Sequence, residues 1–410
     1  MKRLHLGVDY GTNASKLVLR YFEAPGGERA YLLEPNGKLR ILSAVSFDHK
    51  YIYLNGKQGG GVIFKSLKMR FAEEVTGEIG SHFYGDLTTI PNDFTAEDLV
   101  ILSIWRLISI GHLEGVRILG NDGFNMGMTL GIPMSFLDRE DLKSAFLSAA
   151  RLAYLMYREF GPIGSDQLEI ELAQELLAIA RQSLKSKPPI DKNNFRNWIR
   201  SETEASMLWS FFSPSIPSGP YFCVDIGAGT TDANAFNINE EHQGGGWVKN
   251  SMCFFGAHSI PYAMDAILML EANDKNQGYI EIRKGLIQTG SNAYAHLKDN
   301  YYSVKQWSNP KLILLGGGAL ERDLCRALQS HPMVNWKGVT MEAVKLTVPD
   351  DLVRSDESSV SQEDVIFTSV AYGLAQIGPA VPEAAKPNEV QPVISHARST
   401  LLDHQIMYDD

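Results

Sequence analysis

The sequence predicts a mixed α/β protein with two similar halves, each containing a β-sheet covered by helices. A strand, a polar turn and a second strand occur near residues 4–20 and again near 221–238. In both copies an aspartate stands at the end of the first strand and glycine and threonine follow it in the turn. Later strands are separated by segments whose apolar residues recur every three to four positions, which is typical of amphipathic helices. The 410 residues are enough for two large domains.

The first half alternates between short apolar runs and helical patterns. The expected elements are strands over 4–8, 16–22, 41–47 and 128–133 and helices over 98–110, 138–158 and 170–184. The last of these helices is expected to end before Lys187, because the two prolines that follow it cannot continue a helix.

The second half repeats this order. The expected elements are strands over 221–226, 233–238 and 311–315, turns over 227–232 and 316–318, a loop at Gly244–Gly246, and helices over 319–329 and 361–377. After Pro379 the composition changes to proline, alanine, glutamate and lysine, which predicts a flexible linker over 379–392.

Composition argues against several classes of protein. The net charge is −10 and no block of lysine and arginine occurs, so binding to a nucleic-acid backbone is not expected. The three cysteines have no CxxC spacing, which indicates neither a disulfide framework nor a zinc site and fits a reducing cytoplasm. The N-terminus reaches a polar turn too early for a signal peptide, and no run of about 18 apolar residues occurs. A cytoplasmic protein without a membrane segment is expected.

The two polar turns contain residues that are suited to binding phosphate and Mg²⁺. Asp9 and Asp225 each end an apolar strand directly before a glycine- and threonine-containing turn. Glycine lets backbone N–H groups approach phosphate oxygens closely, threonine adds a hydroxyl donor, and the carboxylates suit a hydrated Mg²⁺. One copy alone would be interpreted as an ordinary tight turn. Two copies that face each other would hold a polyphosphate.

A third glycine-rich turn, Gly316–Gly318, lies between an apolar strand and a helix. Without side chains the backbone can lie flat against a bulky group, and a nearby helix N-terminus suits phosphate or ribose oxygens. Alone, this turn would be interpreted as a close-packed strand-to-helix connection. The sequence contains neither a Walker A motif nor a GxGxxG fingerprint.

Taken in order, these turns resemble the phosphate 1, phosphate 2 and adenosine motifs of the actin/Hsp70/sugar-kinase superfamily. Four further segments are most similar to the Hsp70 nucleotide-binding domain. These are the segments 42–47 and 130–138, the stretch 202–208, which is similar to the first connecting helix of that domain, and the stretch 370–375, which is similar to the second. The matches span residues 4–378 in family order.

The resemblance implies two RNase H-like lobes with a nucleotide cleft between them. The first lobe would cover 1–215, with a small subdomain over roughly 41–115. The second would cover 216–378, with a small subdomain over roughly 250–310. Residues 379–410 would form a flexible tail, without a substrate-binding domain of the Hsp70 type.

The resemblance also implies site residues. Asp9 and Asp225 would face Mg²⁺, and Glu202 would lie at the hinge between the lobes near the metal. Lys68 is in the approximate place of the Hsp70 catalytic lysine, and Glu140 is a candidate for positioning the attacking water. The residues expected to hold the nucleotide, ATP or ADP, are Gly11, Thr12, Asn13, Lys16, Gly227, Ala228, Gly229, Thr230, Thr231, Gly316, Gly317, Gly318 and Ala319.

The chain also departs from Hsp70. Between Asp232 and Gly316 the helix that clasps adenine in that family is not recognisable, and residues 279–297 occupy its place. Lys16 lies seven residues after Asp9, at the spacing of the phosphate-binding lysine of actin.

Three functions are therefore weighed. The first is a slow Hsp70-like ATPase that acts as a nucleotide-dependent switch or chaperone-like partner of another protein. The second is an actin-like ATPase that self-assembles into filaments, which Lys16 favours. The third is a small-molecule kinase, for which no clear catalytic-base aspartate is found. A pseudo-ATPase is a further alternative.

Overall fold

The computed structural model describes residues 1–56, 62–78, 89–91, 93–120, 123–187, 195–213, 216–243, 246–260, 278–280, 282–285, 287–289, 291, 310–329, 343–378, 381–382 and 384–385. Within these residues the protein is mixed α/β, and its strands form three sheets of seven, five and four strands.

The largest sheet contains the N-terminal strands. It has the order β10-β8-β1-β2-β3-β15, and β4 also pairs with β2. Its central strand β1 runs antiparallel to β2 and parallel to β8, and β2 runs antiparallel to β3. The strands are β1 (Lys2–Asp9), β2 (Ala14–Tyr21), β3 (Arg29–Leu32), β4 (Ile41–Leu42), β8 (Phe124–Ile132), β10 (Ile199–Ser201) and β15 (Leu352–Arg354).

The second sheet repeats the same pairing. It has the order β14-β11-β12-β13-β16, in which β11 is antiparallel to β12 and parallel to β14, and β12 is antiparallel to β13. Ala343 adds a single parallel bridge to Leu312 of β14. The strands are β11 (Gly219–Ile226), β12 (Thr231–Gln243), β13 (Gly246–Ile260), β14 (Lys311–Leu315) and β16 (Ala384–Ala385).

The first hairpin of each sheet has the same register. Asp9 pairs with Lys16 across the first hairpin, and Asp225 pairs with Asp232 across the second. Lys16 and Asp232 each stand seven residues after the aspartate with which they pair, so they occupy equivalent positions. Strand pairing in the second hairpin continues one step further, to Ile226 and Thr231. The repeat expected from the sequence is therefore present in the strand pairing.

A small four-stranded sheet of order β7-β5-β6-β9 stands apart from the other two. Its strands are β5 (Val45–Phe47), β6 (Tyr51–Tyr53), β7 (Ile63–Phe64) and β9 (Gln167–Glu169). The single strand expected over 41–47 is thus two strands, β4 and β5, which belong to different sheets. The intervening Ser43 donates its backbone N–H to the Asn13 carbonyl and its hydroxyl bonds Ser15, which ties this bend to the first hairpin.

The helices cover the sheets. They are α1 (Leu67–Thr76), α2 (Ala96–Leu119), α3 (Met134–Leu137), α4 (Glu140–Phe160), α5 (Ile170–Lys185), α6 (Glu202–Phe212), α9 (Arg322–Gln329) and α10 (Gln362–Leu374), with short 3₁₀ turns at η1 (Pro35–Gly37), η2 (Phe195–Asn197) and η4 (Gly317–Leu320). Capping boxes begin α2, with Thr95 and Asp98, and α10, with Ser361 and Asp364.

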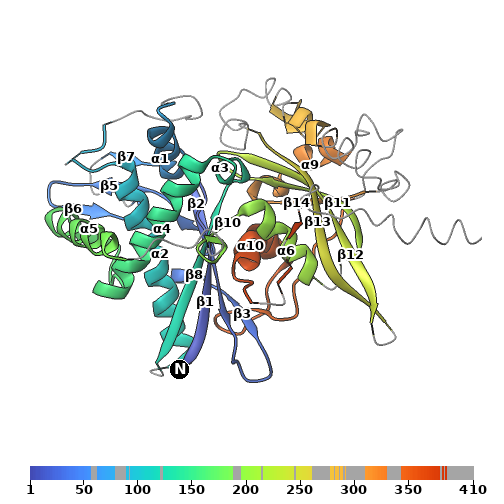
Figure 1. Cartoon of the computed structure of the whole chain (residues 1–410), viewed down its shortest axis with the longest axis horizontal. Helices are drawn as coiled ribbons and strands as arrows, with labels where there is room; N and C mark the ends of the chain where they lie inside the picture. Colours follow the sequence, from blue (N-terminus) through green and yellow to red (C-terminus); the bar gives the residue numbers. More distant parts are fainter. Residues whose placement is uncertain are drawn as a thin grey trace, which may run out of the picture.

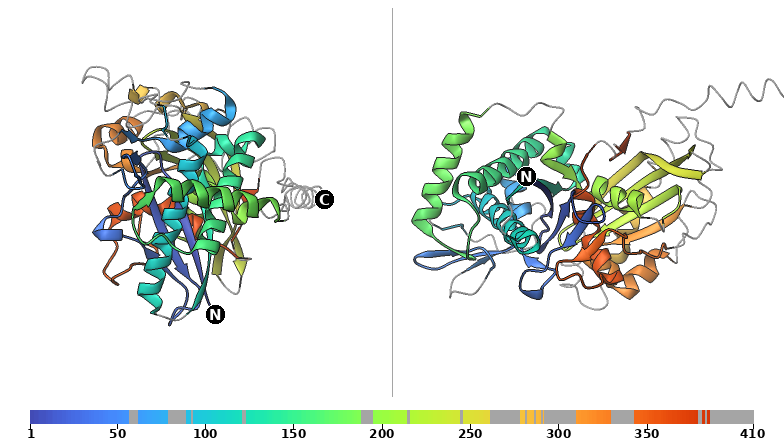
Figure 2. Two further views of the ribbon diagram at one scale, coloured as in Figure 1. Left: turned by 90° about the vertical axis from the view of Figure 1, so that its left-hand side faces the viewer. Right: turned by 90° about the horizontal axis from the view of Figure 1, so that it is seen from below.

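Helices α6 and α10 lie between the two large sheets (Figure 1). They cross at Gly373, where a Cβ atom would lie 1.8 Å from the Ala205 carbonyl oxygen. Helix α10 also packs on β1, where a Cβ on Gly7 would lie 2.1 Å from the Ala371 carbonyl oxygen. The view from below shows the blue-to-teal elements on one side and the yellow strands on the other (Figure 2). Glycine at these two positions allows the close packing.

Helix α2 is long and apolar enough to cross a membrane by length and composition alone. In the structure, 72% of its most apolar window is buried. It packs against α1, α4, β1 and β2, which is the environment of a core helix.

Several expected boundaries differ. The helix expected over 319–329 begins as the 3₁₀ turn η4, and α9 starts at Arg322. Gly246 belongs to β13, whereas residues 244–245 of the expected loop lie outside the described residues. The expected linker contains β16, which pairs with Met252 and Cys253. Most of the tail and of the region 250–310 lies outside the described residues, and so do residues 281, 286, 290 and 292–297 of the segment 279–297.

Candidate functional site

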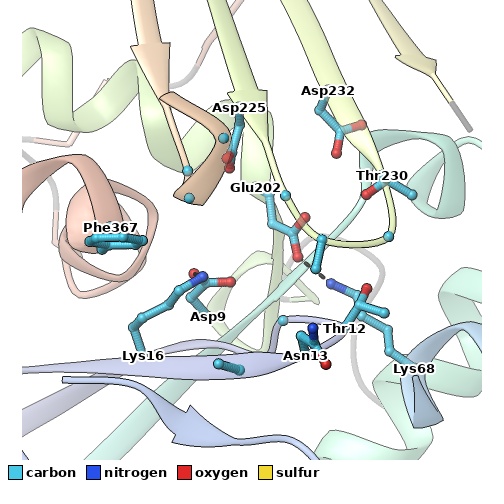
Figure 3. A pocket seen from close by; sticks show the side chains of 18 of the residues that line it. Asp9, Thr12, Asn13, Lys16, Lys68, Glu202, Asp225, Thr230, Asp232 and Phe367 are labelled. Carbon is cyan, nitrogen blue, oxygen red and sulfur yellow. Dashed lines mark hydrogen bonds and ion pairs between the residues drawn. The ribbon is translucent and has the colours of Figure 1, made fainter. Parts of the chain in front are cut away.

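The three glycine-rich turns meet at one cavity of about 290 Å³. The first comes from the β1–β2 hairpin, the second from the β11–β12 hairpin and the third from the end of β14. Figure 3 shows side chains from both hairpins pointing into this space. The lining residues are Asp9, Gly11, Thr12, Asn13, Ala14, Lys16, Arg40, Lys68, Glu202, Asp225, Gly227, Ala228, Gly229, Thr230, Asp232, Gly316, Gly317, Gly318 and Phe367.

The first two turns touch each other although they are far apart in the sequence. A Cβ atom on Gly229 would lie 2.9 Å from both Oγ1 and Cγ2 of Thr12, a distance at which one group must move. Within the first turn, a Cβ on Gly11 would lie 2.3 Å from the Ala14 carbonyl oxygen. Glycine is therefore needed both to close the first turn and to bring the two turns together.

The third turn packs directly against the second. Gly316 has φ of +76°, and a Cβ there would lie 2.2 Å from Oδ1 of Asp225. Its backbone N–H donates to the Ile366 carbonyl oxygen, which attaches the turn to α10. Because Gly316 has no side chain, the Asp225 carboxylate can lie close to the backbone of the third turn.

The charged side chains of Asp9, Lys16, Lys68, Glu202, Asp225 and Asp232 are here called the floor of the cavity. Two lysines form ion pairs within it. Lys16 Nζ lies 2.9 Å from Oδ2 of Asp9, and Lys68 Nζ bonds Oε1 of Glu202. All four side chains are largely buried, with 3% of the Lys68 side chain and 17% of the Lys16 side chain exposed. The Lys68–Glu202 pair joins α1 to the first residue of α6.

Two carboxylates of the floor, those of Asp225 and Glu202, have raised pKa values. Burial raises the pKa of Asp225 to about 7, with Lys16 opposing this and Asp9, Glu202 and Asp232 adding to it. Burial also raises the pKa of Glu202 to about 7, with Lys68 opposing it and Asp9 adding to it. Burial lowers the pKa of Lys16, but the nearby charges of Asp9, Asp225 and Glu202 outweigh this and the net shift is upward. The cavity therefore holds an excess of acidic groups close together.

Asp9 and Asp225 are the residues that the sequence predicts to face Mg²⁺. No group of three or more His, Cys, Asp or Glu side chains in the described part of the chain is placed to hold a metal ion by itself. Asp9 and Asp225 nevertheless line the same cavity from the two different sheets. Mg²⁺ is commonly bound by one or two carboxylates together with waters and substrate phosphates. The residues present fit a magnesium ion that arrives with a phosphate ligand.

Most of the residues expected from the sequence lie at this cavity, and three do not. Thr231 is fully buried in β12. Ala319 lies within η4, and its carbonyl oxygen accepts a bond from Cys325. Glu140 is at the start of α4, where its highly exposed side chain bonds Lys143. None of these three lines the cavity.

Four lining residues were not expected: Ala14, Arg40, Asp232 and Phe367. Asp232 had a detectable signal, because it stands seven residues after Asp225 as Lys16 stands seven after Asp9. Arg40 and Phe367 carry no local motif. The guanidinium of Arg40 lies 3.9 Å from the centroid of the Phe367 ring, so long-range packing alone creates this pair.

Comparison with models of known protein families gives no match, and comparison with curated proteins gives no significant similarity.

Proposed function

We propose that this chain binds ATP with Mg²⁺ in the cavity between its two large sheets and hydrolyses it, as an ATPase similar to the nucleotide-binding domain of Hsp70. One observation carries the proposal. Two hairpins of the same register, each with an aspartate at the end of its first strand and each from a sheet with the same strand pairing, line a single cavity together with a glycine-rich third turn. The repeated pairing supports two RNase H-like lobes over 1–215 and 216–378.

The residues near the contact between the first two turns could bind the phosphate groups of ATP. Thr12 and Thr230 offer hydroxyl donors there, and Asn13 lies close by (Figure 3). Gly227 and Gly229 allow the tight packing of these turns, because a Cβ on either would lie 2.9 Å from an atom of Thr230 or Thr12. Lys16 and Lys68 bring positive charge to the same floor. These groups would orient a triphosphate by hydrogen bonds and charge rather than by covalent chemistry.

The acidic floor explains why a cation would be required. The four carboxyl groups of Asp9, Glu202, Asp225 and Asp232 outnumber the three cationic side chains that line the cavity, so an unaccompanied polyphosphate would meet repulsion. Bound Mg²⁺ would neutralise phosphate charge and orient the water that attacks the γ-phosphate. Asp9 and Asp225 would face its hydration shell from opposite hairpins.

Hydrolysis also needs an acceptor for the proton of the attacking water. Burial raises the pKa of Glu202 to about 7, so its carboxylate is a suitable base at neutral pH. The water oxygen would form a bond to the γ-phosphorus while the bond to the bridging oxygen of ADP breaks, and the carboxylate would take the proton. Turnover is expected to be slow without a partner protein, because Lys16 and Lys68 are already engaged by Asp9 and Glu202.

The crossing of α6 and α10 supports a role as a nucleotide-dependent switch. Glu202 begins α6 and lines the cavity, while Gly373 places α10 against the same helix. A change at the γ-phosphate would therefore reach the contact between the two sheets, and we propose that another protein recognises the resulting surface.

Titration calorimetry with ATP and ADP, with and without Mg²⁺, followed by a phosphate-release assay, tests the proposal. The wild type is expected to bind Mg²⁺-ATP and release phosphate, whereas Asp9→Asn and Asp225→Asn lose most of the release. Glu140→Gln is the matched control and keeps it, because Glu140 does not line the cavity. Absence of nucleotide binding by the wild type would overturn the proposal.

An actin-like, filament-forming ATPase is the second candidate, and the position of Lys16 favours it. Its Nζ lies 2.9 Å from Asp9 inside the cavity, where it could contact a phosphate. Light scattering with Mg²⁺-ATP separates the two candidates. Polymer that forms with ATP would favour the filament, and protein that stays monomeric at every concentration would reject it.

A further inference from the structure

One end of the cavity is aromatic rather than acidic. Phe367 of α10 lies on the opposite side of the view from Lys68 and Thr230 (Figure 3). Its ring packs near the third turn, because a Cβ on Gly317 would lie 3.4 Å from Cε1 of Phe367. In this view Phe367 therefore lies at one end of the cavity and Lys68 and Thr230 at the other, with Asp9 and Lys16 between them (Figure 3).

Arg40 covers this aromatic end. Its guanidinium carbon lies 3.9 Å from the centroid of the Phe367 ring, which is the shortest distance between a cation and an aromatic ring among the described residues. Arg40 lies in the connection between β3 and β4, so the pair joins residues 327 positions apart (367 − 40). At this distance the cation lies against the face of the ring.

Arg40 differs from the other cations of the cavity. Lys16 and Lys68 are each paired with a carboxylate, whereas Arg40 forms no ion pair with any residue in the described ranges. Arg40 is exposed and lines the cavity, so a ligand in the cavity can reach its side chain. A planar cation held on an aromatic ring and free of carboxylates is prepared to stack on a second flat group.

We propose that Arg40, held by Phe367, is the residue that stacks on the base of the bound nucleotide and gives the site a preference for purines. The inference rests on the proposed nucleotide site and adds its base specificity. A purine is expected because its two fused rings cover more of the guanidinium plane than a pyrimidine does, and stacking strength follows the overlap. Phe367 acts through Arg40 as a positioning residue.

Titration calorimetry with Mg²⁺ present and four ligands, ATP, GTP, CTP and inorganic tripolyphosphate, tests the assignment. The wild type is expected to bind both purine nucleotides roughly tenfold more tightly than CTP. Arg40→Ala is expected to weaken ATP and GTP binding roughly tenfold and to leave tripolyphosphate within about twofold of the wild type. Phe367→Leu keeps an apolar side chain of similar size and should show a smaller change in the same direction.

Two further variants separate stacking from charge. Arg40→Lys keeps the positive charge but loses the planar group, so it should lose most of the purine preference. Arg3→Ala is the control, because Arg3 lies 5.4 Å from the Phe22 ring in an arginine–phenylalanine pair outside the cavity. This control should bind every ligand as the wild type does.

The outcomes are distinguishable. If Arg40→Ala weakens tripolyphosphate as much as ATP, Arg40 contacts phosphate and the stacking assignment is wrong. If Arg40→Ala binds ATP, GTP and CTP as the wild type does, the assignment is also wrong while the proposed function stands. If the wild type binds neither ATP nor tripolyphosphate, the proposed function itself fails and the assignment fails with it.

Discussion

At the scale of single residues, the floor of the cavity depends on charges that compensate one another inside the protein. Lys68 and Glu202 form the most deeply buried of these pairs, with 3% and 11% of their side chains exposed. Removing one partner of such a pair leaves a buried charge without compensation, which costs more than the pair itself contributes.

Lys68→Met is therefore expected to destabilise the protein by roughly 3 kcal/mol. The double variant Lys68→Met, Glu202→Gln should recover part of that loss, because the uncompensated carboxylate is gone. Urea denaturation of the two single variants and the double variant measures the coupling. The exposed pair of Arg326 and Asp323 serves as the control cycle and should show little coupling. Strict additivity at Lys68 and Glu202 would contradict the prediction.

Asp225 makes stability depend on pH. Its pKa is about 7 in the folded protein against 3.8 for an unperturbed carboxyl, so the folded state keeps a proton that the unfolded state releases between these values. Stability contributed by this group is therefore lost as the pH rises through that window, and it is lowest above pH 7.

Asp225→Asn removes the titrating group. The difference in free energy of unfolding between the variant and the wild type should shift in favour of the variant by about 2 kcal/mol from pH 5 to pH 8. Denaturant unfolding at both pH values measures this gain. Asp323→Asn, at an exposed carboxylate of α9, should show no such difference. A gain at pH 5 that equals the gain at pH 8 would show that Asp225 does not titrate in this range.

At the scale of elements, the crossing of α6 and α10 sets the position of the cavity. Gly373 permits the two helices to touch, because a Cβ there would lie 1.8 Å from the Ala205 carbonyl oxygen and 2.6 Å from its carbon. These are backbone atoms and cannot rotate away. Any side chain at residue 373 must push the helices apart.

Gly373→Ala is expected to lower stability by about 3 kcal/mol, although alanine has the higher helix propensity. The displacement of α6 should also weaken nucleotide binding, because Glu202 at the start of α6 lines the cavity. Thermal unfolding and calorimetry measure both effects. Gly164→Ala is the matched control, since a Cβ there meets nothing within 4 Å. A Gly373→Ala variant as stable as the control would refute the packing argument.

At the scale of the whole molecule, the proposed site needs both large sheets at once. The touching turns come from β1–β2 and β11–β12, and the third turn follows β14. A ligand that contacts all three would join the two halves and slow their separation.

Hydrogen exchange measured by mass spectrometry tests this. Mg²⁺-ATP is expected to slow amide exchange together in residues 9–16, 225–232 and 316–318, and Mg²⁺ with ADP should protect the first two turns less. ATP with EDTA is the control and should give little protection, because the acidic floor then lacks its cation. Protection confined to one turn would mean that the ligand does not join the halves.

Much of the fold could be predicted from local sequence. The first strand, the long helices α4 and α5 and the strand β14 were placed within a few residues, because each shows strong apolar periodicity bounded by glycine, proline or polar residues. The segment 41–47 was harder, because its apolar run is continuous although its two parts pair with different sheets. Periodicity does not identify the strand's partner.

Some residues of the candidate site could likewise be predicted from local sequence, and others could not. By itself the sequence determined the three turns, because an aspartate or a glycine at the end of a buried strand is a local pattern with a local cause. Only the tertiary structure decided that Asp232, Arg40 and Phe367 join these turns at the cavity while Thr231, Ala319 and Glu140 do not line it. The physical reason is that the direction of a side chain and its distant neighbours are set by strand register and helix packing, and these depend on residues hundreds of positions away.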